Sequence, residues 1–193
     1  MIRKSLALAC VPFIFACGPD ASDDYPEVER GGTGSVDDRI AAAKIVVDAN
    51  GLAVGSGAER EAPRFGSARG EVDALLATAF DQKPEMTSND ECGAGPTDFS
   101  QVGPLQVAYQ DDRFTGWYLQ KGNGVVTADG VATGTAFSAL RDERPVQIIT
   151  GSTLDGEFQY QTGDAGMITG FFQGEPDDGR IVGLSAGMTC FFR

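Results

Sequence analysis

The stretch Arg113-Phe114-Thr115-Gly116-Trp117 recurs 67 residues later as Arg180-Ile181-Val182-Gly183-Leu184, and each copy follows a turn that contains aspartate. Gly66-Ser67-Ala68 recurs at a spacing of 68 as Gly134-Thr135-Ala136. Two further pairs of segments keep the same order along the chain: residues 46–52 with 125–131, and residues 105–109 with 168–172. Four matches in one order indicate an internal duplication.

We predict that the duplication divides the folded part of the chain into two units, residues 39–122 and 123–193. In the first unit, a helix capped by Ser67 is predicted by apolar residues at positions i, i+3, i+4 and i+7: Val72, Leu75, Leu76 and Ala79. A shorter helix that starts at Thr135 is predicted in the second unit, with Phe137 and Leu140 on its apolar side.

The segments that follow each helix alternate between apolar and polar residues. Leu105, Val107 and Tyr109 fall on one face of such a strand. Asn50-Gly51 and Asp129-Gly130 lie between β-rich flanks and are typical of hairpin turns. The predicted fold class is α+β, in which two tandem helix-plus-antiparallel-strand repeats form one antiparallel sheet with the helices on one face.

The stretch Gly66-Ser67-Ala68-Arg69-Gly70-Glu71-Val72, followed by Leu75-Leu76 and Pro84, resembles the signature of small lipoproteins such as the outer-membrane assembly factor BamE. The glycine that follows the leucines in that signature is replaced here near Ala79-Phe80. The tandem arrangement over roughly residues 45–193 is similar to that of the β-lactamase inhibitory protein, which duplicates a helix-on-sheet unit. The resemblance implies a fold of helices packed on an antiparallel sheet.

The N-terminus predicts export. Arg3 and Lys4 precede an uncharged apolar run, residues 6–16, which is too short to span a membrane. The end of this run, Ile14-Phe15-Ala16-Cys17, resembles a lipobox in which Phe15 is bulkier than usual. We therefore predict a signal peptide over residues 1–16; the alternative is an ordinary signal peptide that happens to contain cysteine.

The residues after the cleavage site predict a membrane anchor. We expect lipid on Cys17 and a flexible tether over residues 17–38, because this segment is rich in Gly, Pro and Asp and too polar to bury a core. Aspartate directly after the lipidated cysteine would resemble an inner-membrane retention signal, and Gly18 stands there instead. The expected location is therefore the cell envelope, lipid-anchored at the outer membrane and facing the periplasm.

The remaining cysteines predict a disulfide. Cys10 would leave with the signal peptide and Cys17 would carry lipid, which leaves Cys92 and Cys190 in an oxidising compartment. A bond between them would close a loop of nearly 100 residues and stabilise the fold by up to about 4.7 kcal/mol. The alternative is a pair of unbonded buried thiols.

The charge of the chain excludes nucleic acid as a partner. The formal net charge is −13, and removal of residues 1–16 leaves 13 basic against 28 acidic residues, a charge of −15. A protein this acidic is repelled by nucleic acid. The expected partners are the membrane, through the N-terminal lipid, and another envelope protein.

We find no catalytic or cofactor-binding pattern in the sequence. The chain has no histidine, which excludes Cys–His chemistry and imidazole acid–base catalysis. Gly183-Leu184-Ser185-Ala186-Gly187 fits the nucleophile-elbow spacing, but it lacks a histidine base and room for the following helix. The chain also resembles alphaproteobacterial proteins that carry an aspartate-semialdehyde dehydrogenase name. Such an enzyme needs a cofactor domain for which this chain has no room, so we predict no enzyme, no cofactor and no metal site.

Two kinds of binding surface stay open. Acidic turns at Asp48, Asp111-Asp112 and Asp177-Asp178 could bind a cation or a small ligand, although turn formation explains them. Trp117 is predicted on the strand face opposite Phe114 and Tyr118, so one of these two sets could be exposed, and Trp117 is a candidate for an interaction surface. The leading hypothesis is a membrane-anchored, non-enzymatic protein-binding or scaffold module that contacts its partner through the helix-free face of the sheet. The alternative is a periplasmic lipoprotein that binds a small ligand or a cation.

Overall fold

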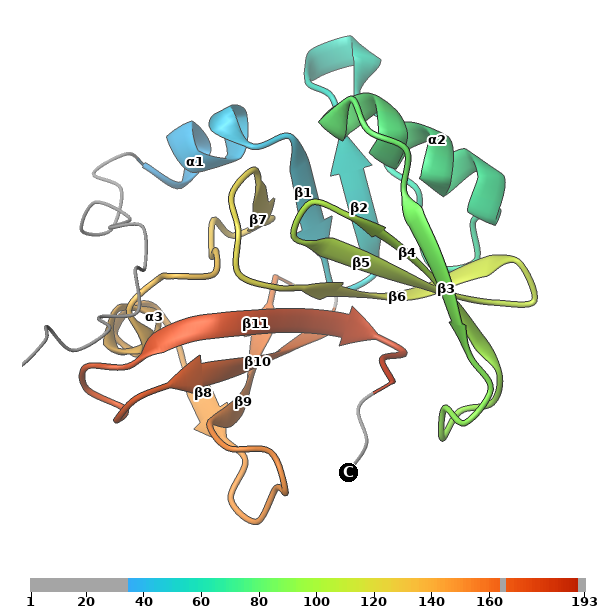
Figure 1. Cartoon of the computed structure of the whole chain (residues 1–193). Helices are drawn as coiled ribbons and strands as arrows, with labels where there is room; N and C mark the ends of the chain where they lie inside the picture. Colours follow the sequence, from blue (N-terminus) through green and yellow to red (C-terminus); the bar gives the residue numbers. More distant parts are fainter. Residues whose placement is uncertain (1–34, 164–165, 191–193) are drawn as a thin grey trace, which may run out of the picture.

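The computed structural model describes residues 35–163 and 166–190. Within these residues the structure has an eight-stranded antiparallel sheet, a three-stranded sheet, three α-helices and a short 3-10 helix, Gly57–Glu59 (Figure 1). The order of the larger sheet is β3-β4-β5-β6-β11-β10-β9-β8. Its strands are β3 Glu85–Asn89, β4 Thr97–Val102, β5 Leu105–Gln110, β6 Arg113–Leu119, β8 Val146–Ile148, β9 Glu157–Thr162, β10 Gly166–Gln173 and β11 Arg180–Gly187. The α+β class and the dominance of antiparallel strands are as predicted.

The strand order of the large sheet is symmetric about its centre, where the two units meet. Strands β3 to β6 come from the first unit and β8 to β11 from the second, and the last strands of the two units, β6 and β11, pair in the middle. Tyr118 lies directly opposite Ser185 in this pair. Because these two residues are themselves related by the spacing of 67, the central pair coincides with a pseudo-twofold axis that relates the units.

The contacts at the start of each main helix repeat in both units. The amide of Gly66 donates to the carbonyl of Phe114, and the amide of Gly134 donates to that of Ile181, both at 2.7 Å. The carbonyls of the same two glycines accept from the guanidinium groups of Arg113 and Arg180, at 3.3 and 2.9 Å. The duplicated sequence motifs are therefore the residues that join the start of each helix to the last strand of its own unit.

Helix α2, Arg69–Phe80, packs on the first unit. Val72 and Leu76 are fully buried, and Leu75 and Ala79 pack partly buried against the same core, as the apolar spacing predicts. The predicted cap is wrong: the residue before the helix is Ala68, and the Ser67 hydroxyl accepts from the amide of Arg64 instead. Ser67 is needed in the turn before the helix, where its carbonyl accepts from the amide of Phe114.

Helix α3, Phe137–Glu143, packs on the second unit and begins two residues later than predicted. The carbonyl of Thr135 accepts from the amide of Ile181, so this residue belongs to the helix-entry turn. The ring of Phe137 stacks on that of Phe172 at 4.0 Å between centroids, and Leu140 is also buried. Residues of both helices join one hydrophobic cluster with Trp117, which places α2 and α3 on the same face of the large sheet.

The smaller sheet is not predicted by the sequence. It has the order β2-β1-β7, with strands β1 Ile45–Asp48, β2 Gly51–Val54 and β7 Val125–Thr127. The Asn50-Gly51 turn joins β1 and β2 as expected, whereas Asp129-Gly130 closes a turn from Thr127 to Val131 that leads into no second strand. Strands β1 and β7, the matching segments of the two units, pair in parallel instead of entering the large sheet.

A short helix occupies the end of the predicted tether. Helix α1, Val36–Ala42, starts at a capping box in which Ser35 and Asp38 each accept from the backbone of the other. Residues 36–38 are therefore helical, and the boundary predicted at residue 38 is too late. The predicted signal peptide, Cys17 and residues 17–34 of the predicted tether lie outside the described residues.

Gly66 and Gly134 test the equivalence of the two units. Both have positive φ, +97° and +89°, in the helix-entry turns. We expect Gly66→Ala and Gly134→Ala to lower the free energy of unfolding by similar amounts, about 1–2 kcal/mol each, because L-residues are strained there. Gly70→Ala is the control. Gly70 lies inside α2 without positive φ, so this substitution should raise the free energy of unfolding by about 0.5–1 kcal/mol. Urea unfolding measures the stability of all three variants. If Gly66→Ala lowered the free energy of unfolding and Gly134→Ala left it unchanged, the two units would not be equivalent.

Candidate binding face

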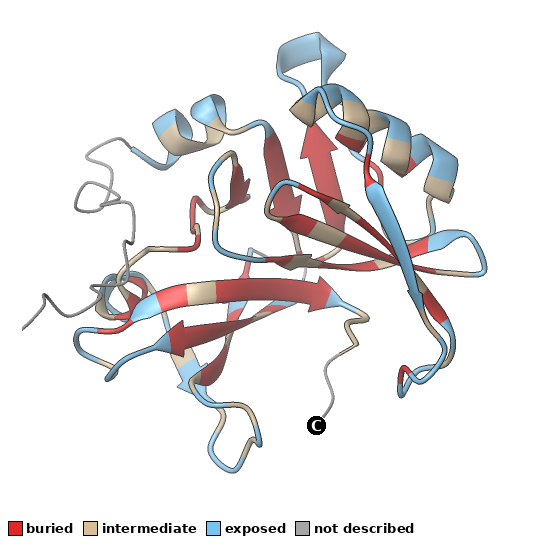
Figure 2. Ribbon diagram, in the orientation of Figure 1, coloured by how far each residue is buried: buried red, intermediate tan, exposed pale blue. Residues whose placement is uncertain are grey.

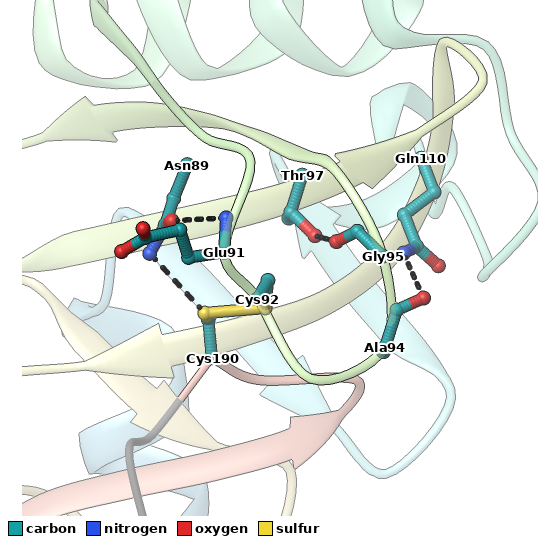
Figure 3. The surroundings of a disulfide bond; sticks show 8 residues. All are labelled: Asn89, Glu91, Cys92, Ala94, Gly95, Thr97, Gln110 and Cys190. Carbon is teal, nitrogen blue, oxygen red and sulfur yellow. Dashed lines mark hydrogen bonds between the residues drawn. A yellow bond between two sulfur atoms is a disulfide. The ribbon is translucent and has the colours of Figure 1, made fainter.

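Cys92 and Cys190 form a disulfide, with their Cα atoms 5.4 Å apart. Cys92 lies in the loop between β3 and β4, and Cys190 lies three residues after the end of β11 (Figure 3). The side-chain amide of Asn89 also donates to the sulfur of Cys190 at 3.5 Å. The structure confirms the predicted pairing and shows that the bond joins the edge of the first unit to the last strand of the second.

Trp117 is not on the surface, and its predicted placement is wrong. Its side chain has no exposed area, and its indole N–H donates to the carbonyl of Asp48 at 2.8 Å. A β-bulge between β5 and β6 is the reason: Tyr109 lies opposite Phe114 and Ala108 opposite Gly116, which leaves Thr115 as an extra residue. The extra residue turns Trp117 to the same face as Phe114, beneath the small sheet.

The opposite face of the large sheet, which we call the helix-free face, carries the alternate residues of all eight strands. Strand register assigns to it Glu85, Thr87, Asn89, Thr97, Phe99, Gln101, Gln106, Ala108, Gln110, Arg113, Gly116, Tyr118, Gln147, Glu157, Gln159, Gln161, Met167, Thr169, Phe171, Gln173, Arg180, Gly183 and Ser185. Glutamine is the most frequent type in this set. Two of its charged members are acidic: Glu85, on the edge strand, and Glu157, which is 1% exposed and accepts from the hydroxyl of Ser152. The other two, Arg113 and Arg180, lie at the starts of β6 and β11, where they donate to the carbonyls of Gly66 and Gly134.

The middle of the helix-free face is therefore polar without being charged. Gln159 is half-buried and donates to the side-chain oxygen of Gln147 at 2.7 Å. Burial raises the pKa of Tyr118 above its usual value, which keeps this phenol protonated at physiological pH. Gln106 and Thr169 are also half-buried, and Gln161 and Met167 are exposed. The middle of this face thus presents hydrogen-bonding groups whose burial would not require charges to be desolvated.

One end of this face is already covered by the chain itself. Residues 188–190 leave β11 and cross β6, where the amide of Met188 donates to the carbonyl of Thr115 at 2.9 Å. A small hollow remains beside them, lined by Phe99, Gln106, Ala108, Trp117, Tyr118, Thr189 and Cys190. The sheet edges differ from this covered region: β3 is exposed along almost its whole length (Figure 2).

The acidic turns at Asp48 and Asp177-Asp178 have structural partners, and in the third turn Asp112 lies 4.0 Å from the guanidinium of Arg69. One oxygen of Asp48 accepts from the amide of Asn50 and the other pairs with Arg64 at 2.6 Å. Asp177 pairs with Arg141, and Asp178 accepts from the amide of Glu175. Within residues 35–163 and 166–190, no three cysteine, aspartate or glutamate side chains gather closely enough to hold a metal ion. The geometry therefore adds nothing to the cation-binding alternative.

Ser185 lies inside β11, as its interpretation as a strand residue requires. It is 3% exposed, and its hydroxyl donates to the carbonyl of Thr169 at 3.4 Å. No helix follows β11 within the described residues, so the spacing of glycines around Ser185 does not form a nucleophile elbow here.

Two buried tyrosines on the core face were missed by sequence reasoning. The hydroxyl of Tyr109 donates to Asp73 on α2 at 2.7 Å, and the guanidinium of Arg69 lies 5.1 Å from the centre of its ring. Tyr160 is contacted in the same way by Arg144, whose partner is Asp129. Burial raises the pKa of both tyrosines, and the nearby carboxylates raise it further. The apolar alternation placed Tyr109 on the same strand face as Leu105 and Val107 but gave no signal for its polar partner, and it did not single out Tyr160 at all.

Comparisons with known proteins give no relative for this arrangement. No family model matches the chain, and neither a curated protein nor a solved structure matches it significantly. The likeness to BamE-like lipoproteins and to the β-lactamase inhibitory protein thus stays a likeness of short motifs. Among the residues that the structure describes, no helix is long and apolar enough to cross a membrane.

The buried tyrosines predict a loss of stability at alkaline pH. Their pKa values are raised in the folded state, so above pH 10, the ordinary tyrosine value, the unfolded chain releases protons that the folded chain keeps. Stability is thus fully present below pH 10 and falls above it, by roughly 1.4 kcal/mol per pH unit for each of the two groups. Urea unfolding between pH 9 and 11.5 measures this slope. Tyr160→Phe should remove about half of it, and an unchanged slope would contradict the assignment.

Proposed function

We propose that this chain is a membrane-tethered envelope lipoprotein whose folded part is a non-enzymatic protein-binding module. The helix-free face is its contact surface. The observation that carries the proposal is the charge distribution: the formal net charge is −13, yet the middle of an eight-stranded sheet face presents glutamine, threonine and tyrosine.

The uncharged face distinguishes a protein partner from other classes of ligand. A charged ligand would be bound by opposite charge, and the charged residues of the helix-free face lie away from its middle. Glu85 and Glu157 lie towards its two edges, and Arg113 and Arg180 lie at strand starts, where they donate to the carbonyls of Gly66 and Gly134. Protein interfaces are depleted of charge at their centres and use hydrogen bonds around buried apolar contacts. Met167, which is exposed, supplies such a contact among the glutamines, on the same strand as the largely buried Phe171. The N-terminal sequence and the Cys92–Cys190 bond support an oxidising envelope compartment as the place where the partner is met.

Lipid anchoring is tested at Cys17. We expect Cys17→Ser to move the full-length protein from the membrane fraction to the soluble envelope fraction, because the hydroxyl cannot receive the thioether-linked lipid. The control is Cys10→Ser, which removes a cysteine from the predicted signal peptide and should leave fractionation unchanged. If Cys17→Ser stayed in the membrane fraction, the anchoring proposal would be wrong.

The contact surface is tested by adding one charge to it. A photo-crosslinking residue at Thr169 should capture a protein partner in intact cells, and Gln159→Arg should reduce the yield about 10-fold by burying an unpaired cation in the interface. Ala74→Arg is the matched control, since Ala74 is exposed on α2 and adds the same charge to the other side of the molecule.

The two variants separate the outcomes. If the crosslink yield were equal in Gln159→Arg and Ala74→Arg, the partner would not contact the helix-free face at Gln159, and the proposal would be wrong. Thermal unfolding of both variants checks that a lost crosslink does not come from a lost fold.

A further inference from the structure

We propose that the Cys92–Cys190 disulfide acts as a redox latch: it holds residues 188–190, here called the strap, over the helix-free face, and its reduction uncovers that part of the face. Only the consequence for partner binding rests on the proposed function. Release of the strap on reduction does not depend on any partner and can be measured on the purified protein.

The strap crosses the sheet between two fixed ends. At one end it continues from β11, and at the other Cys190 is bonded to Cys92 in the β3–β4 loop. That loop is held independently: the amide of Gly95 donates to the carbonyl of Cys92, and the side chain of Gln110 donates to the carbonyl of Ala94 (Figure 3). The loop is thus anchored to β5, whatever the state of the sulfur atoms.

The strap itself has few other contacts. Its backbone makes one hydrogen bond that the structure describes, from the amide of Met188 to the carbonyl of Thr115. Gly187, which precedes it, has a φ of +73° and turns the chain off the line of β11. Loss of the disulfide therefore leaves this hydrogen bond, the contact of Asn89 with the Cys190 sulfur and the packing of Met188 on Gly116 to hold three residues in place.

The surface beneath the strap is less polar than the rest of the helix-free face. Phe99 and Ala108 are 8% and 3% exposed. Gly116 is packed so closely that an added Cβ would overlap the carbonyl of Met188. A partner that reaches this surface gains an aromatic contact and close access to the backbone, both of which the strap denies to it.

The chemistry of opening is thiol–disulfide exchange with a dithiol. One thiolate of the dithiol attacks Sγ of Cys190, which is more exposed than the 6% of Cys92, and Cys92 leaves as a thiolate that takes up a proton. The second thiol of the reductant then displaces Cys190, which becomes a thiol. Two electrons and two protons pass to the protein, and the dithiol becomes a disulfide.

Hydrogen exchange of the full chain tests the latch without any partner. With dithiothreitol as the dithiol, we expect the amides of residues 188–190 to exchange at least about 10-fold faster, while those of β5 and β6 keep their protection. The double variant Cys92→Ser/Cys190→Ser should exchange in the same way without reductant. Unchanged exchange at residues 188–190 after verified reduction would overturn the proposal, as would loss of protection across the whole sheet.

Gly116→Ala moves the strap without touching the sulfur atoms. Its Cβ should displace Met188 and raise the exchange of that amide with the disulfide intact, because φ at this position is not in the left-handed region and the three atoms nearest to the added Cβ all belong to Met188. Gly93→Ala is the matched control, since an added Cβ there meets nothing within 4 Å although it adjoins Cys92.

Crosslinking from Gln106, beside the strap, completes the test. The yield of partner crosslinked from Gln106 should rise when the disulfide is reduced, and it should also rise in the Gly116→Ala variant. If the strap opens and capture at Thr169 persists while capture at Gln106 does not change, the latch does not regulate binding and this inference fails alone. If no partner is captured at either position although the strap opens, the proposed function fails.

Discussion

The pairing of β6 with β11 is the constraint on which the rest of the structure depends. Each unit alone would be a four-stranded sheet with a helix on one face and two open edges. Pairing their last strands, with Tyr118 opposite Ser185, merges the two sheets and removes one edge from each. The same pairing fixes both helices on one side, so that Leu76 of α2 and Phe137 of α3 enter a common core. Within residues 35–163 and 166–190, no helix lies on the opposite face of the eight strands.

The β-bulge beside the central pair decides which side chains reach each face. Without the extra residue at Thr115, Trp117 would project into the middle of the helix-free face, and a large aromatic group would dominate it. With it, Trp117 closes the core and bonds to the carbonyl of Asp48, while Tyr118 takes the outward position. The carbonyl of Ala108 accepts from the hydroxyl of Thr115, so the bulge is held by its own side chain.

How far the sequence predicts this molecule depends on the range of the interaction involved. The helices of both units, the alternation of β5 and the Cys92–Cys190 pair follow from local spacing and from counting cysteines, and the structure agrees with them. The bulge, the separate small sheet and the parallel pairing of β1 with β7 depend on contacts between residues far apart in the chain. Nothing in the local pattern distinguishes a regular strand from a bulged one, because Thr115 suits both. Ser35-x-x-Asp38, by contrast, is a local signal for α1 that a reading of the segment as tether overlooks.

The two units contribute equivalent strands to the large sheet, but the candidate site on the helix-free face differs between them. Gly116 and Gly183 are equivalent residues of the two units, and both lie on the helix-free face where another group covers them. The strap covers Gly116 and the ring of Tyr118 covers Gly183, so the same small residue serves a backbone crossing in one unit and an aromatic contact in the other. The disulfide adds a covalent difference between two halves that share one architecture. Under the proposed latch, this covalent bond determines whether the part of the face beneath the strap is open to the proposed partner.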